Sequence, residues 1–367
     1  MPKDDVDWGK SFILEISMKR NLITVALLGW AACASAQSSV TLYGVADGWV
    51  GQTTSKAGTA PTDRTSVVES DGLSASRWGI RGSEDLGGGL RANFVLEQAV
   101  SIDNGTIKNV SASNVGFNRA AYVGLSGGFG EVRLGRMLGA FDALRGPFNQ
   151  LYDASGFAST GTVWGLGTTA SSSQAAVTSS DYLARLNNTF MYATPVLGGF
   201  SGSMSYSPGE GITTATAAPR SISSHVKYAN GPLKIGYGYQ AEHYTTGTNK
   251  FKLASGAYDW GVARLVASIQ RQDDSRIAGG QSANEWQAGV DVPFGAAILA
   301  VGYASSKTKN AAGVEVADAR GLSLMGIYSL TKRTRLYAAL RKVDARRTDG
   351  STSTEASRYG IGVSHTF

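Results

Sequence analysis

The chain ends in the stretch Arg358-Tyr359-Gly360-Ile361-Gly362-Val363-Ser364-His365-Thr366-Phe367. Every second residue of this stretch is large and mostly apolar, whereas arginine, glycine, serine and threonine fill the positions between. Such period-two alternation places one set of side chains on each face of a β-strand. The same pattern recurs at 200–207, 233–240 and 285–292, and no sustained helical stripe interrupts it. The sequence therefore predicts an all-β protein.

Short and long connections alternate between these strand patterns. Short turns are expected at 84–88, 126–130, 194–198, 230–231, 259–261, 293–295 and 331–334. Long polar loops are expected at 52–73, 102–117, 208–219, 307–318 and 345–355, and the longest connection runs from about 138 to 182. Strands of about 9–11 residues cross a bilayer, and short turns opposite long loops are typical of outer-membrane barrels. We count 16 strands and predict an antiparallel transmembrane β-barrel.

A soluble β-sandwich or solenoid would also show alternation, but its apolar face would close a dry core. Here the apolar face carries aromatic residues near strand ends, where the two membrane interfaces favour them. The opposite face is rich in glycine and serine with scattered charges. The mean hydropathy of −0.10 is compatible with either fold, because alternating faces cancel each other in the average.

The N-terminal region reads as an export signal that starts at Met18. Lys19 and Arg20 precede an apolar run at 22–33, and the small residues 34–36 follow. We predict an upstream start extension at 1–17, with a cytoplasmic tail as the alternative, a signal peptide at 18–36 and the barrel at 37–367. The single cysteine, Cys33, lies inside this signal. A lipoprotein acceptor role for Cys33 is disfavoured by Trp30, because that position prefers a small aliphatic residue.

Charge and motif content exclude several other classes of protein. The net charge is +6, but no run of lysine and arginine exceeds two residues, so nucleic-acid binding is not expected. The three histidines, His225, His243 and His365, lie in no recognisable nucleophile context, so we do not expect an enzyme. No Cys/His metal spacing and no phosphate-cradling loop is present in the sequence. No cofactor is therefore expected.

Four stretches carry a family resemblance: 39–44, 76–90, 122–136 and the terminal Phe367. In order and spacing they resemble the general porins of Gram-negative bacteria, and in particular the anion-selective porins of the β-proteobacterial branch. The resemblance implies a homotrimeric outer-membrane barrel of 16 strands whose long third loop folds into the lumen and narrows it. The acidic Pro-Glu-Phe-type motif of enteric relatives is absent from this loop, which reads Phe141-Asp142-Ala143-Leu144-Arg145-Gly146-Pro147-Phe148 here.

Arginine is the residue type that suits an anion path, because it stays charged and its planar fork binds oxyanions. The resemblance maps the family's basic constriction ladder onto four residues: Arg77, Arg119, Arg136 and Arg185. Alternation turns Arg77, Arg81, Arg133 and Arg185 towards the lumen, with Leu186 on the side opposite Arg185. The same alternation places Arg119 and Arg136 on the lipid side. A β-bulge at Gly135 would turn Arg136 inward, and a strand-end position at the rim is the alternative for each arginine.

The acidic side chains in the lumen are fewer. Glu97 shares the inward face of its strand with Arg91 and Asn93, and Asp142 and Asp153 are the main carboxylates of the inner loop. The excess of basic groups predicts a general diffusion channel that prefers small anions. The alternatives are a substrate-specific channel for sugars or phosphate and, less favoured, a barrel enzyme. A sugar channel would need a file of lumen aromatics, whereas the candidates Tyr43, Trp49 and Tyr337 are scattered.

The C-terminal residue has an expected role in assembly. The apolar series that ends in Phe367 resembles the signal read by the machinery that inserts barrels into the outer membrane. The expected partners are this machinery, two further copies of the chain, outer-membrane lipids and the permeating anions.

Overall fold

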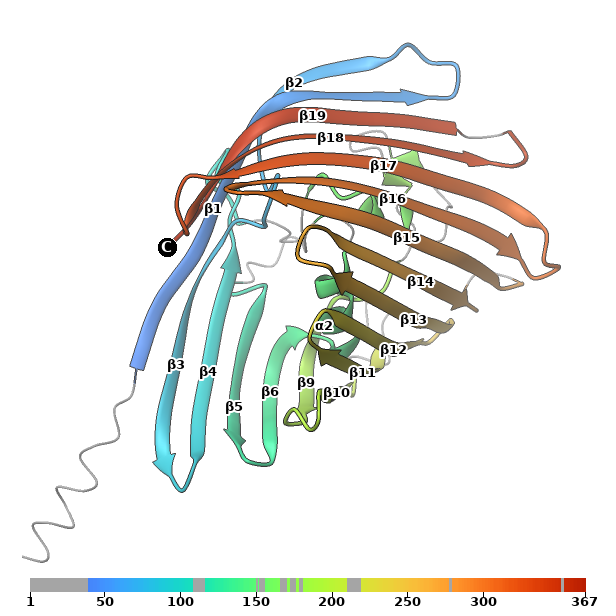
Figure 1. Ribbon diagram of the computed structural model, residues 1–367. Helices are drawn as coiled ribbons and strands as arrows, with labels where there is room; N and C mark the ends of the chain where they lie inside the picture. Colours follow the sequence, from blue (N-terminus) through green and yellow to red (C-terminus); the bar gives the residue numbers. More distant parts are fainter. Residues whose placement is uncertain are drawn as a thin grey trace, which may run out of the picture.

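The computed structural model describes residues 39–107, 116–149, 151, 156–165, 170–171, 176–177, 181–209, 219–276, 279–350 and 353–367. The predicted start extension at 1–17, the predicted signal peptide at 18–36 and Asp153 lie outside these residues. Among the described residues, no helix is long and apolar enough to cross a membrane. The described part is dominated by one large antiparallel sheet that curves around an interior (Figure 1).

The sheet contains 17 strands within the described ranges. They are β1 (Ser39–Ala57), β2 (Asp63–Ser70), β3 (Arg77–Gly87), β4 (Leu90–Ala99), β5 (Ala120–Gly127), β6 (Gly130–Leu138), β9 (Arg185–Ala193), β10 (Phe200–Ser207), β11 (Arg220–Asn230), β12 (Leu233–Tyr244), β13 (Gly247–Asp259), β14 (Arg264–Asp274), β15 (Gln281–Phe294), β16 (Ala297–Asn310), β17 (Glu315–Ser329), β18 (Thr334–Arg347) and β19 (Ser353–Thr366). The connection between β6 and β9 holds α2 (Ala140–Arg145), the 3-10 turn η1 (Gly146–Phe148), α3 (Thr160–Val163) and a separate pair of two-residue strands, β7 (Ala170–Ser171) and β8 (Ala176–Val177).

The sheet closes on itself through β1. One edge of β1 pairs with β19, and its other edge pairs first with β3 and further along with β2. Strands β2 and β3 therefore form one interrupted strand, and the ring contains 16 positions, as the sequence predicted. At the seam, the backbone N–H groups of Gly44 and Phe367 each donate to the other residue's carbonyl oxygen at 3.1 Å. Closure gives each described strand of the ring except β2, which pairs with β1 alone, a partner on both sides, as the backbone of a strand in a bilayer requires.

The break between β2 and β3 is held by Asp47, which is fully buried. Its carboxylate accepts hydrogen bonds from the backbone N–H groups of Gly72, Leu73 and Ser74 and from the Tyr337 hydroxyl, at 2.7–3.3 Å. These bonds replace the ladder bonds that the interrupted strand loses. They also fix the point at which β3 starts, and so the position of Arg77.

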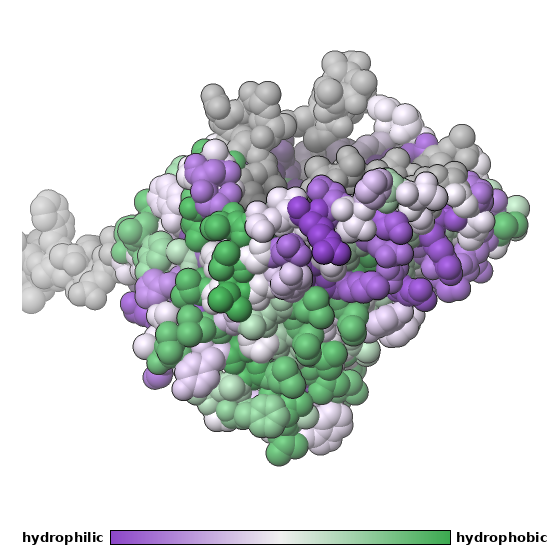
Figure 2. Space-filling model, turned by 90° about the horizontal axis from the view of Figure 1, so that it is seen from above, coloured by the Kyte–Doolittle hydropathy of each residue, from purple (hydrophilic) through white to green (hydrophobic). Residues whose placement is uncertain are grey.

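The two faces of the barrel wall have the polarity expected in lipid. Large apolar side chains stand on the outer face, for example Val123 at 59% and Ile361 at 61% exposure, whereas Gln240, Glu242 and Gln287 are buried. In the space-filling view, hydrophobic residues cover a broad area of the visible face and hydrophilic residues border it (Figure 2). A soluble sandwich would place these faces the other way round, so that alternative is wrong.

Each of the seven predicted short turns falls between two strands of the barrel. Three predicted long loops, at 52–73, 307–318 and 345–355, are wrong, because β1 and β2, β16 and β17, and β18 and β19 continue through much of them. In these regions the outward side chains are polar, such as Lys307, Arg320 and Arg346. The sequence therefore shows no alternation of apolar and polar residues in these regions, although the backbone hydrogen bonding of the strands continues.

The seam gives a testable expectation. A methyl group at Gly44 would lie 2.3 Å from the Phe367 ring and 2.6 Å from the Arg77 carbonyl oxygen. Gly44→Ala should therefore strain barrel closure, at a cost of about 1–3 kcal/mol. The midpoint temperature at which the folded, fast-migrating band converts to the unfolded band on semi-native electrophoresis should fall. Gly326→Ala is the matched control, because nothing lies within 4 Å of a methyl group there; equal midpoints for the two variants would contradict this role of the seam.

Candidate functional site on the inner wall

A single carboxylate organises one region of the inner wall. Glu97 of β4 accepts a hydrogen bond from Arg119 Nε at 2.7 Å and from the Tyr43 hydroxyl at 3.1 Å, and Arg77 Nε lies 3.5 Å from it. Arg119 directly precedes β5, so the alternation of that strand does not fix its direction. Its side chain turns to Glu97 although simple alternation placed it on the lipid side.

A β-bulge brings a further arginine to this region. The register between β6 and β9 shifts between Gly135 and Met137, and Gly135 adopts φ +135°. The proposed bulge at Gly135 is therefore confirmed. Arg136 Nε donates to the Asn118 carbonyl oxygen at 2.8 Å, and its Nη1 donates to the Asn187 side chain.

Arg185 completes the group from β9. Its Nε donates to the Arg119 carbonyl oxygen at 3.1 Å, and its charge interacts with those of Arg119, Arg136, Glu97 and Asp142. The prediction for its neighbour Leu186 is wrong, because Leu186 is only 3% exposed. The left-handed φ of +51° at Asn188 interrupts the alternation that was used to place it.

The structure thus brings Arg77, Arg119 and Arg185 to Glu97 and places Arg136 near Arg185, and we call these five residues the basic cluster. They come from β3, β4, the start of β5, β6 and β9, which are consecutive in the ring. Four guanidinium groups against one carboxylate leave this part of the wall strongly positive.

Two predicted arginines lie outside the basic cluster. The Arg81 guanidinium lies 5.2 Å from the centre of the Tyr43 ring, and that of Arg133 lies 5.1 Å from the Tyr122 ring. Arg133 also forms an ion pair with Glu131 at 2.6 Å. Both residues lie nearer than the basic cluster to the short turns, along β3 and β6.

The connection between β6 and β9 packs against the inner face of β10, β11, β15 and β17. The backbone N–H groups of Ala140 and Phe141 donate to the hydroxyls of Ser205 and Ser223. Further along the connection, Ser159 and Thr160 of the α3 region, Phe148 and Trp164 bond to β15 and β17. These contacts are with the buried polar face of the wall, so the described parts of the connection lie on the interior side.

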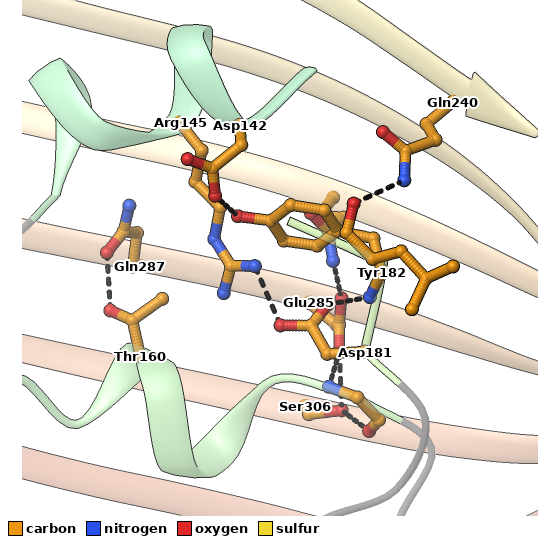
Figure 3. Close-up of polar contacts among 12 residues, drawn as sticks. Asp142, Arg145, Thr160, Asp181, Tyr182, Gln240, Glu285, Gln287 and Ser306 are labelled. Carbon is orange, nitrogen blue, oxygen red and sulfur yellow. Dashed lines mark hydrogen bonds and ion pairs between the residues drawn. The ribbon is translucent and has the colours of Figure 1, made fainter. Parts of the chain in front are cut away.

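A half-buried ion pair joins the two ends of this connection (Figure 3). Arg145 Nη1 lies 2.7 Å from Asp181 Oδ2, and its guanidinium stacks on the rings of Trp164 and Tyr182 at 4.9 and 4.8 Å. Burial is the largest single influence and lowers the pKa of Arg145, but the charges of Asp181, Tyr182 and Glu285 and the hydrogen bond to Asp181 together outweigh it, so the pKa is raised above its usual value. Arg145 is therefore a permanent cation.

Asp142 is engaged by the same network. The Tyr182 hydroxyl donates to the Asp142 carboxylate. Burial, and then the charge of Asp142, raise the pKa of Tyr182 well above its ordinary value, so the phenol stays protonated and remains a donor. Glu285 of β15 accepts the backbone N–H of Gly165 and is part of the anchoring as well. The two described acids predicted to temper the field, Glu97 and Asp142, are thus both hydrogen-bonded within the wall and the connection.

Sequence reasoning missed two inward arginines, Arg341 of β18 and Arg358 of β19. The signal was present, because Arg358 occupies the face opposite Tyr359 in the terminal strand. The three candidate aromatics do point inward, as predicted: Tyr43 bonds to Glu97, Tyr337 bonds to Asp47, and Trp49 packs edge-on against Phe157 at 4.9 Å. Each serves the wall or the connection, and they form no continuous file.

Comparison with known proteins agrees with this geometry. Residues 23–350 match the Gram-negative porin family, so the chain belongs to that family of outer-membrane channels rather than to the enzymes. It is 35% identical over 333 residues to the outer membrane porin protein 32 of Delftia acidovorans, covering 88% of this chain and 89% of the relative. It is 28% identical to an outer membrane porin protein of Bordetella pertussis, covering 95% of this chain and 100% of that protein.

Solved structures give the same fold. The anion-selective porin from Comamonas acidovorans superposes with a TM-score of 0.72 at 29% identity and covers 90% of this chain and 100% of that one. OmpT of Vibrio cholerae, in a loop-deletion form, superposes at 0.64 with 16% identity and covers 90% of this chain and 99% of its own, which shows the shared barrel alone.

The anchoring of the connection can be tested at Arg145. Arg145→Gln removes the cation that pairs with the half-buried Asp181 carboxylate and that stacks on Trp164 and Tyr182. The connection should loosen, and single-channel records should show more frequent closures and greater open-channel noise. The double variant Arg145→Gln/Asp181→Asn removes both charges and should be quieter than the single variant. A single variant as quiet as the unmodified channel would show that this ion pair does not hold the connection.

Proposed function

We propose that the chain is a general diffusion porin whose water-filled lumen conducts small hydrophilic solutes and prefers anions. The basic cluster carries this proposal, because four arginines face one carboxylate on a single stretch of wall. The related porin from Comamonas acidovorans is described as anion-selective, which supports it. The scattered, engaged positions of Tyr43, Trp49 and Tyr337 favour general diffusion over a sugar-specific path.

The physical basis is electrostatic. Selectivity in a channel is set by its radius and by the charges that line it. A charge pair about 4 Å apart interacts by about 1 kcal/mol in bulk water but by about 4 kcal/mol at an effective dielectric constant of 20, so a narrow lumen strengthens the field of the wall. Arg77, Arg119, Arg136 and Arg185 would form the constriction, with Arg81 and Arg133 extending the positive wall and Glu97, Asp142 and Asp153 moderating it.

The connection between β6 and β9 would supply the other side of the constriction. Its described residues pack against the inner face of the wall, and the interaction of Asp142 with Arg185 brings it towards the basic cluster. We therefore infer that it narrows the lumen beside the arginines.

Export and assembly complete the proposal. Residues 18–36 would act as a signal peptide behind an upstream extension at 1–17, and Phe367 would be read by the outer-membrane insertion machinery. In the folded protein Phe367 also closes the seam with Gly44. We further propose a homotrimer, as is typical of the family.

The arginine roles are tested by replacing two members of the basic cluster. In Arg77→Ser/Arg185→Ser, two fixed positive charges are lost while Glu97 remains. The permeability ratio of chloride to potassium, taken from reversal potentials in a KCl gradient, should fall towards or below unity. The fall should be largest in dilute salt, because the screening length is about 10 Å at 0.1 M and about 3 Å at 1 M.

The matched control is Arg346→Ser/Arg347→Ser. These arginines pair with Asp318 and Asp349 at the long-loop end of β18, away from the basic cluster. The control should alter the permeability ratio far less. If the two double variants shift it equally, the positive charge acts only as a diffuse surface field and the constriction assignment is wrong.

The trimer is tested by electrophoresis. The native protein should migrate as a compact, SDS-resistant oligomer, and boiling should convert it to a monomer of about the mature mass, because the backbone bonds of a closed barrel resist detergent until they are melted together. Migration as a folded monomer before boiling would contradict the trimer. Migration that does not depend on heating would contradict the closed barrel.

A further inference from the structure

Arg341 and Arg358 form an unusual pair on the inner wall. They are direct cross-strand neighbours on β18 and β19, and Arg341 is only 9% exposed. Like charges placed directly opposite each other destabilise a sheet. Among the described residues, neither guanidinium forms an ion pair with a carboxylate. Within the described part of the chain, two cations are therefore held together without a carboxylate in direct contact.

Their hydrogen bonding is incomplete. Both Nη1 atoms donate to one acceptor, the carbonyl oxygen of Gly156, at 3.0 Å from Arg341 and 3.3 Å from Arg358. Within the described part of the chain, the Arg341 Nε is buried without a partner. A guanidinium carries five N–H donors, so a single shared carbonyl leaves most of the donors of this pair unused.

The surroundings supply little compensation. Glu69 is the one described carboxylate whose charge acts on both arginines, and it contacts neither directly. The Arg358 guanidinium lies 5.7 Å from the centre of the Trp49 ring, which packs on Phe157. The surroundings of Arg341 and Arg358 are therefore net positive, because the two guanidinium charges face one more distant carboxylate, Glu69, and the uncharged ring of Trp49.

We propose that Arg341 and Arg358 form an oxyanion-binding subsite for a doubly charged ligand such as inorganic phosphate. Two adjacent planar guanidinium groups match the geometry of an anion that carries charge on several oxygens. The hydrogen bonds that they donate to such an anion are charge-assisted. The inference rests on the proposed function, because the ligand enters from a lumen that admits anions. The subsite would be a second anion-binding position in the lumen, separate from the basic cluster.

The subsite borders the path that leads to the basic cluster. The Gly156 N–H donates to the carbonyl oxygens of Asp71 and Gly72, and the segment that follows them ends at Arg77. Gly156, whose carbonyl oxygen the two arginines share, is thus hydrogen-bonded to the segment that joins β2 to β3. An anion released from Arg341 and Arg358 meets Arg77 as the next cation along this segment.

The experiment measures chloride current through the purified full-length channel in planar bilayers, while inorganic phosphate is added at constant ionic strength. The unmodified channel should show a saturable fall in current. In Arg341→Gln/Arg358→Gln, the phosphate concentration that halves the inhibitable current should rise by at least about tenfold, because charge-assisted hydrogen bonds are lost. The chloride preference, which the basic cluster provides, should persist.

The outcomes separate the subsite from the proposed function. An unmodified channel without chloride preference would overturn the proposed function. A chloride-selective channel with no saturable inhibition, or with the same half-inhibiting concentration in both proteins, would overturn the subsite. If the half-inhibiting phosphate concentration is the same in both proteins, Arg341 and Arg358 only hold Gly156 in place. The double variant would then differ from the unmodified channel in conductance and current noise alone.

A second variant covers a failure of the first to fold. Arg341→Lys/Arg358→Lys keeps both charges and a donor for Gly156 but removes the planar forks. It should insert normally, keep its chloride preference and still require more phosphate for half-inhibition than the unmodified channel. Inhibition equal to that of the unmodified channel would show that the guanidinium geometry is not used.

Discussion

The structure depends on one constraint, which is that a strand in lipid must have its backbone N–H and carbonyl groups bonded within the protein. Closure of the ring meets this requirement, and the seam between β1 and β19 is where it is completed, through the paired backbone groups of Gly44 and Phe367. Closure also fixes which side faces which solvent. Apolar side chains cover the outside, and the polar set of the described strands turns to the interior.

The residues that we assign to the function lie on the inner wall of the barrel. Because the interior is polar, arginines can stand there without meeting lipid, and departures from regular strands then bring them together. The bulge at Gly135 lies beside Arg136, which bonds to Asn118 and Asn187. The position of Arg119 before β5 frees it to reach Glu97, and the break held by Asp47 sets where Arg77 starts β3. The half-buried ion pair of Arg145 and Asp181 joins the two ends of the connection between β6 and β9.

Alternation predicted the strands, the turns and the polarity of each face, because period two is a local property that the sequence displays directly. It failed at three long loops, where polar outward side chains hide continuing strands. It also failed where the backbone departs from a regular strand: Asn188 has a left-handed φ and reverses the side of Leu186, and an asparagine pair is only a weak sign of such a departure. The bulge at Gly135 was predictable because a glycine stood beside an arginine of the wrong parity. The hydrogen bond from Tyr182 to Asp142 could not be predicted, because it joins residues from the two ends of a long connection.

The central claim is that a wall with more fixed arginines than free carboxylates gives the lumen a positive field that selects anions. The most direct measurement is the zero-current potential of the unmodified channel across a planar bilayer that separates concentrated from dilute KCl. We expect the dilute side to become negative, because chloride crosses faster than potassium, and the potential to grow as both solutions are diluted at a fixed ratio. A positive dilute side, or a potential that does not depend on dilution, would contradict it.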